Sequence, residues 1–194
     1  SEWPNYRWGP VSTRAWESGL VDQTGCFWPL VEATAANLDV RAAVAEMRAQ
    51  IELVRAAGVE FTHLDTHMLS ALLPELFQAY VELGFEYGVP VLAPRRFDEY
   101  TRAFNTLGMD DAEWERYTAS LEERGMPLVD TLRVTPGYHG GDAEGGRVEL
   151  YEHILRELPP GITYFSLHPN APGDIEVIDP HSAQWRTFEY QYLQ

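Results

Sequence analysis

The regular alternation of short apolar runs with longer amphipathic stretches constrains this chain most. Helix-like stretches at residues 38–58, 74–84, 110–123 and 142–158 alternate with strand-like runs at residues 61–65, 89–92, 128–134 and 162–167. Strands separated by helices in this way run parallel and are joined by right-handed crossovers. The sequence therefore predicts an α/β fold with parallel strands, as either an open sheet or a (β/α) barrel.

Local signals support several of these boundaries. Asn37 or Asp39 can cap the first amphipathic helix, which would end at Gly58. Pro74 suits the first turn of the next helix. Residues 1–29 are rich in Trp, Pro and Gly and lack a sustained period, which predicts a long ordered loop.

Polar side chains follow the end of each expected strand. In both architectures ligands bind at the carboxyl ends of the strands, so these positions are the candidate site. In chain order they are Asp65 and His67, Arg95 and Arg96, Tyr138 and His139, and His168.

The sequence His63–Leu64–Asp65–Thr66–His67 is the densest of these groups. On a strand His63 and Asp65 share a face, and His67 projects from the loop just beyond, an arrangement compatible with a metal or proton-transfer site. In the alternative interpretation, His63 is a hydrogen-bonded core residue and Asp65 caps the following turn. His168, before Pro169, is either a second imidazole of the same site or a strand-end histidine without a ligand.

The charge of the chain argues against several partners. Thirty acidic and 14 basic residues give a net charge of −16, which repels nucleic acid and anionic lipid. Every basic residue is arginine, so no lysine is present for a Schiff base or a phosphate-binding loop. The single Cys26 predicts a structural thiol, and no apolar run is long enough to span a bilayer. We expect a cytoplasmic protein with a small-molecule substrate, and the sequence leaves open a homo-oligomer.

The aromatic residues of the first 29 positions allow two interpretations. They can stack on sugar rings at the mouth of a barrel, or they can close its open end as core. The residues concerned are Trp3, Tyr6, Trp8, Trp16, Phe27 and Trp28.

At these motifs the chain resembles a known family. The sequence Thr62-His63-Leu64-Asp65-Thr66-His67 resembles the Thr-His-Leu-Asp-Ser-His strand-end motif of the YdjC-like carbohydrate deacetylases. Residues 1–10 resemble a segment that follows a Gly-x-His strand in one branch of that family. Leu167-His168-Pro169 resembles the Cys-His-Pro motif found late in the sequences of this family. Arg95 falls near the arginine that, in the family, follows the strand after the Thr-His-Leu-Asp-Ser-His motif. The sequence departs from the family at residues 68–70, where Met-Leu-Ser replaces His-x-His, and at Tyr164, where an acidic residue is common.

The resemblance implies an incomplete TIM-like (β/α) barrel, with residues 1–194 as a single catalytic domain that lacks its first strands. It also implies a metal-dependent hydrolase that removes an N-acetyl group from an amino sugar, with zinc or magnesium as the divalent metal. His67 matches one metal ligand of the family. The Asp and His that supply the other two ligands are absent from these residues, so we expect this segment alone to be inactive.

The same resemblance suggests a role for each remaining site residue. His168 would protonate the leaving amine, Asp65 would orient an imidazole, and Arg95 would stabilise the oxyanion or hold a hydroxyl group. Two other functions remain open. The chain could be another metal-dependent barrel hydrolase, such as an amidohydrolase or phosphoesterase, or a catalytically silent carbohydrate-binding barrel.

Overall fold

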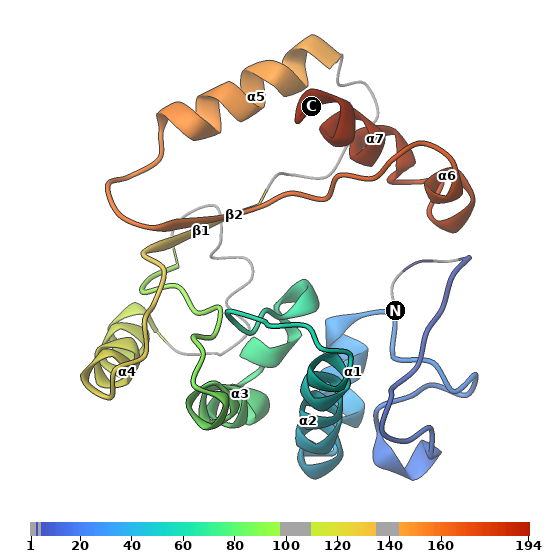
Figure 1. Ribbon diagram of the computed structural model, residues 1–194, viewed down its shortest axis with the longest axis vertical. Helices are drawn as coiled ribbons and strands as arrows, with labels where there is room; N and C mark the ends of the chain where they lie inside the picture. The colour runs from blue at the N-terminus through green and yellow to red at the C-terminus, as the bar shows by residue number, and fades with distance from the viewer. Residues whose placement is uncertain (1–2, 4, 98–109, 135–143) are drawn as a thin grey trace.

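The computed structural model of the protein describes residues 3, 5–97, 110–134 and 144–194 (Figure 1). The elements, in chain order, are a 3-10 helix η1 (Trp16–Ser18), α1 (Val31–Asn37), α2 (Val40–Ala56), a 3-10 segment η2 (His67–Leu72), α3 (Pro74–Tyr87), α4 (Asp111–Glu123), β1 (Thr131–Val134), α5 (Glu144–Arg156), β2 (Thr163–Ser166), α6 (Asp174–Ile178) and α7 (Ala183–Tyr192). None of the helices in these ranges is long and apolar enough to cross a membrane.

The strands lie between two groups of helices. β1 and β2 pair in parallel, with Thr131 opposite Thr163 and the register continuing to the ends of both strands. In Figure 1 the helices α1 to α4 lie on one side of this pair, and α5, α6 and α7 lie on the other. The structure thus confirms an α/β fold with parallel strands.

Two of the four expected strands are reduced to single bridges. Leu64 bridges Val91 and Pro94 bridges Val129, both in parallel. The four expected segments therefore lie side by side in the order in which they occur along the chain. Within the described residues, only β1 and β2 form a regular ladder. Pro90 and Pro94 explain this difference, because proline has no N–H to donate to a neighbouring strand.

The expected helices form, and their caps explain where they begin. The Asp39 side chain accepts a hydrogen bond from the Ala42 N–H, so Asp39 rather than Asn37 caps α2. Pro74 occupies the first turn of α3, and Asp110 forms a capping box with Glu113 at the start of α4. The sequence analysis missed α1, α6 and α7, and the expected loop over residues 1–29 contains η1 and a bridge between Val21 and Phe27.

The main core lies where α3 and α4 pack against the strand segments. Phe77, Trp114 and Leu132 are each at most 2% exposed within it. The Trp114 indole N–H donates to the Pro94 carbonyl at 2.9 Å, which ties α4 to the second strand segment. This core fixes the positions of the strand ends on which the candidate site is built.

The N-terminal segment connects the two groups of helices. Its Val11 and Ser12 N–H groups donate to the buried carboxylate of Glu46 on α2, at 3.0 and 2.8 Å. At its other end the Asn5 side chain donates to the Val177 carbonyl of α6 at 2.8 Å. Tyr6 and Trp8 lie in the stretch of chain between these two anchored points.

Candidate active site

The His67 turn is held by its neighbours. Thr66 is buried, and its hydroxyl oxygen accepts a hydrogen bond from the Ala71 N–H at 2.8 Å. The Ser70 hydroxyl donates to the His67 carbonyl at 2.9 Å. These bonds fix the backbone on both sides of His67, while its imidazole remains exposed.

The backbone directly after His67 is strained. Met68 and Leu69 have φ values of 53° and 54°, in the left-handed region that side chains with a Cβ rarely adopt. Such strain costs about 1–3 kcal/mol per residue, and it persists only where the surrounding structure enforces it. Here it turns the chain sharply away from the strand, so that His67 stands at the bend.

Asp65 is fixed by two hydrogen bonds. Its Oδ1 accepts from the Thr66 N–H at 2.6 Å, and its Oδ2 accepts from the Tyr164 hydroxyl of β2 at 2.7 Å. Burial, followed by the bond to Asp65, raises the pKa of Tyr164 to about 12, so this phenol stays neutral and donates. The first strand segment and β2 are therefore joined by one polar contact between residues 99 positions apart.

His63 lies outside this arrangement. Its side chain is exposed, and its Nδ1 lies 3.0 Å from the Thr62 hydroxyl. The interpretation of His63 as a core residue is therefore wrong.

A cavity of about 340 Å³ opens beside the motif. Asp65, Thr66 and His67 line it, together with the aromatic side chains of Trp8 and Trp28. The Trp8 indole and the His67 imidazole meet in an edge-to-face arrangement, with ring centroids 6.2 Å apart. The cavity therefore combines an aromatic wall with a carboxylate and an imidazole.

His168 follows β2 and is held by α7. Its backbone N–H donates to Oε2 of Glu189 at 2.5 Å, and its ring and that of Trp185 meet edge to face at a centroid distance of 5.4 Å. Sequence analysis did not identify Glu189 or Trp185. The one available signal was a lone carboxylate among the aromatic residues of α7, four positions after Trp185.

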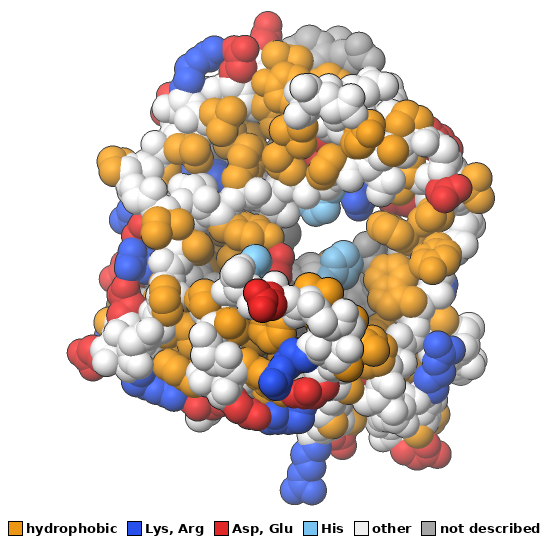
Figure 2. Space-filling view, viewed as in Figure 1, with side chains coloured by type: hydrophobic (Ala, Val, Ile, Leu, Met, Phe, Trp, Pro, Cys, Tyr) orange, Lys and Arg blue, Asp and Glu red, His pale blue; other side chains and the backbone are white. Residues whose placement is uncertain are grey.

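A line of rings and one guanidinium group connects the two histidines. Trp8, which meets His67, lies 5.6 Å from Trp3, and the Arg186 guanidinium lies 5.7 Å from the Trp3 ring. Arg186 also lies 4.8 Å from Trp185, which meets His168. Figure 2 shows a face of the molecule that is hollowed at its centre, with histidine side chains around the opening. That His67 and His168 share one site stays a prediction.

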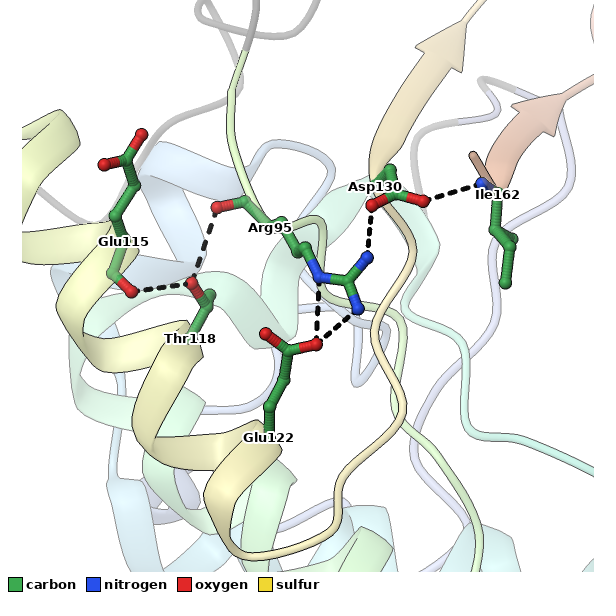
Figure 3. A network of polar contacts seen from close by, with 6 residues as sticks. All are labelled: Arg95, Glu115, Thr118, Glu122, Asp130 and Ile162. Carbon is green, nitrogen blue, oxygen red and sulfur yellow. Dashed lines mark hydrogen bonds and ion pairs between the residues drawn. The ribbon is translucent and has the colours of Figure 1, made fainter. Parts of the chain in front are cut away.

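Arg95 lies at the other end of the strands (Figure 3). Its guanidinium group forms ion pairs with Glu122 of α4 and with Asp130, which directly precedes β1. Asp130 in turn accepts from the N–H of Ile162, which precedes β2, at 2.7 Å. The structure thus places Arg95 at the amino ends of β1 and β2 and not among the residues that line the cavity. Its catalytic role stays an untested prediction.

The described residues do not fit a complete metal centre. Among residues 3, 5–97, 110–134 and 144–194, no three His, Cys, Asp or Glu side chains are placed to hold a metal ion. Zinc sites commonly take at least three protein ligands. Of the expected donors here, His67 offers one imidazole, while both Asp65 oxygens already accept hydrogen bonds.

The remaining candidates give a mixed result. Of the aromatic residues considered for sugar stacking, Trp8, Phe27 and Trp28 line the cavity. Cys26 is a free thiol of intermediate exposure. Tyr138 and His139 lie outside the described residues.

The sequence was compared with known families and proteins. It matches the family described as YdjC-like protein over residues 6–194. It is 29% identical over 174 residues to the "Carbohydrate deacetylase" of Thermus thermophilus, a match that covers 89% of this chain and 59% of that protein. It is also 32% identical over 75 residues to "Carbohydrate deacetylase 1" of Listeria innocua, covering 37% of this chain and 30% of that protein. These matches thus cover less than two thirds of the length of either relative.

A solved structure shares the fold. The chain superimposes with a TM-score of 0.67 on a putative cellobiose-phosphate cleavage protein from Enterococcus faecalis, at 16% sequence identity. The superposition covers 95% of this chain and 64% of that one. At this identity the likeness supports the fold alone.

Proposed function

Since this chain belongs to the family of YdjC-like proteins, we propose that the protein is a carbohydrate deacetylase, which hydrolyses the N-acetyl group of an amino sugar. The names of the two curated relatives support this activity. One structural observation carries the proposal: the cavity beside Asp65 and His67 combines fixed polar groups with an aromatic wall.

The cavity suits one neutral sugar unit. Its volume of about 340 Å³ is at the lower end of the range for small-molecule sites. The Trp8 indole offers an apolar face to the C–H groups of a pyranose, while Asp65 offers carboxylate oxygen to its hydroxyl or amide N–H groups. A net charge of −16 disfavours phosphorylated or polyanionic sugars. We therefore propose an N-acetylated, uncharged saccharide as the substrate.

His168 would act on the leaving group. Amide hydrolysis requires a proton on the departing nitrogen, and a positioned imidazole can donate it. Asp65 and Tyr164 would hold the substrate side of the site in place through their hydrogen bond. The described residues do not complete a metal centre. His67 would contribute a single imidazole ligand to a divalent ion whose other ligands lie outside these residues.

We also propose that the four parallel segments belong to a (β/α) barrel. The four segments lie side by side in the same order as in the chain, and helical segments alternate with them along the sequence. This arrangement is the one that a (β/α) barrel repeats around its axis.

The proposal is tested by acetate release from N-acetylated monosaccharides and short oligosaccharides. The protein is produced at the full length of its curated relatives, with and without a chelator. We expect release that the chelator stops. His168→Ala should lower kcat by about 100- to 10,000-fold, the usual contribution of general acid catalysis, with a smaller effect on KM.

The exposed His153 of α5 provides the matched control. His153→Ala should retain the wild-type rate. The proposal fails if no saccharide of the panel yields acetate, and the assignment of His168 fails if its alanine variant keeps the wild-type kcat.

A further inference from the structure

A buried carboxylate lies directly behind the turn that carries His168. Glu189 of α7 is 0% exposed, and both of its oxygens accept hydrogen bonds. One bond comes from the His168 backbone N–H at 2.5 Å, and the other comes from the Tyr151 hydroxyl of α5. Burying a carboxylate is costly unless its oxygens accept hydrogen bonds. Glu189 therefore depends on the His168 turn and on Tyr151 for the donors that offset this cost.

The helix α7 holds the His168 turn at three points. Trp185 and Glu189 are four positions apart, so they lie on the same face of α7. Glu189 holds the His168 backbone, and the Trp185 ring packs against the imidazole in an edge-to-face arrangement. Beyond Pro169, the Asn170 N–H donates to the Arg186 carbonyl at 3.1 Å. The turn is therefore fixed on both sides of the proline.

A second pair of residues, on α5, supports Glu189. Arg147 is 2% exposed and donates through Nη2 to the Tyr151 hydroxyl oxygen at 3.2 Å. Burial, followed by the bond to Glu189, raises the pKa of Tyr151 to about 12, so its hydroxyl keeps the proton that it donates. The polar contacts thus run from Arg147 through Tyr151 and Glu189 to the His168 N–H.

We propose that Glu189 is the positioning residue of His168: it fixes the imidazole in one orientation and places a negative charge behind it. The imidazole then keeps a proton available for the leaving amine. This inference rests on the role of His168 in the proposed function. It nevertheless predicts a property of His168 that is measurable without any activity.

The charged groups around His168 set the direction of the expected effect. The Arg147 and Arg186 guanidinium groups lie 5.9 and 4.8 Å from the Trp185 ring that contacts His168. Both positive charges weaken the affinity of His168 for a proton, whereas Glu189 strengthens it. Tyr151 is neutral. Glu189→Gln removes the negative charge, keeps the shape of the side chain and leaves both arginines in place, so the proton affinity of His168 must fall.

The test is an NMR pH titration of the histidine rings in this chain, with the His168 signal assigned from His168→Asn. In Glu189→Gln we expect the proton affinity of His168 to fall about tenfold, while the exposed His63 keeps its wild-type midpoint. The control Glu157→Gln removes an exposed charge beyond the end of α5 and should leave His168 unchanged. An unchanged His168 midpoint in folded Glu189→Gln overturns the proposal.

A second variant covers the case in which Glu189→Gln does not fold. Tyr151→Phe keeps the carboxylate but removes the hydroxyl that donates to it. The less compensated charge should raise the proton affinity of His168. An unchanged or lower proton affinity of His168 in Tyr151→Phe overturns the proposal as well. A purely structural role of Glu189 does not predict that the two variants shift the proton affinity of His168 in opposite directions.

The titrations separate this inference from the proposed function. If the shifts occur but the full-length protein releases no acetate, the deacetylase proposal fails and the positioning role stands. If acetate is released, Glu189→Gln should lower kcat more than it changes KM and should move the pH profile toward lower pH. A wild-type pH profile in this variant overturns the positioning role and leaves the deacetylase activity intact.

Discussion

Tyr164→Phe tests the contact that joins the Asp65 motif to β2. The change removes one oxygen, the hydroxyl that donates to Asp65 Oδ2 at 2.7 Å. The ring of Tyr164 packs against the main hydrophobic core, and phenylalanine keeps that packing. The variant therefore isolates the hydrogen bond from the burial of the ring.

The expected loss of stability is about 1 kcal/mol. A hydrogen bond to a charged acceptor contributes about 1.5–3 kcal/mol when the groups are buried. Asp65 is exposed, so water can replace part of the lost bond, and the expected value lies below that range. For a typical urea m value of about 2 kcal/mol per M, the unfolding midpoint should fall by about 0.5 M.

Urea unfolding followed by tryptophan fluorescence measures this loss. Tyr190→Phe, at an exposed position on α7, is the matched control and should change the stability by less than about 0.5 kcal/mol. A double-mutant cycle with Asp65→Ala should give a coupling energy of at least about 0.5 kcal/mol. Equal midpoints for Tyr164→Phe and Tyr190→Phe, or a coupling energy of zero, would refute the assigned contact.

The same variant has a pH signature. The folded pKa of Tyr164, about 12, exceeds the ordinary value of 10.0, so the folded state favours the neutral phenol. The resulting stabilisation is fully present below pH 10 and is lost as the pH rises toward 12. The difference in stability between the wild type and Tyr164→Phe should therefore shrink above pH 10, and a constant difference would contradict the shifted pKa.

Three further predictions concern stability. Met68→Gly should stabilise the fold by about 0.5–1 kcal/mol in chemical denaturation, because glycine adopts a positive φ without strain and at a moderate entropic cost. Met68→Ala keeps the Cβ and should not stabilise the fold. A glycine variant that is less stable than the wild type would count against backbone strain at this position. Arg95→Gln should lower the free energy of unfolding by about 1 kcal/mol, allowing for solvent screening of its two ion pairs. As a control, Arg116→Gln at an exposed position should lower it by less than half of that. In the active protein, a loss of kcat without loss of stability would instead favour a catalytic role for Arg95. Hydrogen bonds, first from the Thr24 side chain and then from Arg7, lower the pKa of Asp22 to about 2. The ionised Asp22 therefore stabilises the folded state above pH 4, and this contribution is lost as the pH falls toward 2. The difference in stability between the wild type and Asp22→Asn should narrow over that window.

The sequence predicts those features that depend on neighbouring residues. The Asp39 cap and the Pro74 helix start require only a few residues around them, and both are confirmed. The helix expected from residue 110 also forms, and the structure adds the capping box of Asp110 at its start. Periodicity also located the segments that became β1 and β2. Regular strands at residues 61–65 and 89–92 were not confirmed, because the two prolines interrupt pairing.

The contacts that shape the candidate site depend instead on tertiary packing. Tyr164 was noted only as a departure from a family pattern, and its bond to Asp65 joins residues 99 positions apart. Glu189 belongs to no sequence motif, and its bond to the His168 N–H exists only because α7 packs behind that turn. Arg95 follows a segment that forms only single bridges, and its side chain binds Glu122 and Asp130, which no local pattern indicates.

The most direct test of the central claim is whether an N-acetylated sugar binds in the cavity beside His67. Indole N–H signals in two-dimensional NMR spectra, recorded with increasing N-acetylglucosamine or its β-1,4-linked dimer, report this binding residue by residue. We predict that the Trp8 signal moves, because Trp8 lines the cavity, and that the buried Trp114 signal, bonded to the Pro94 carbonyl, stays in place. A titration in which Trp8 does not move while the signals of distant residues do would contradict the assignment of this cavity as the carbohydrate site.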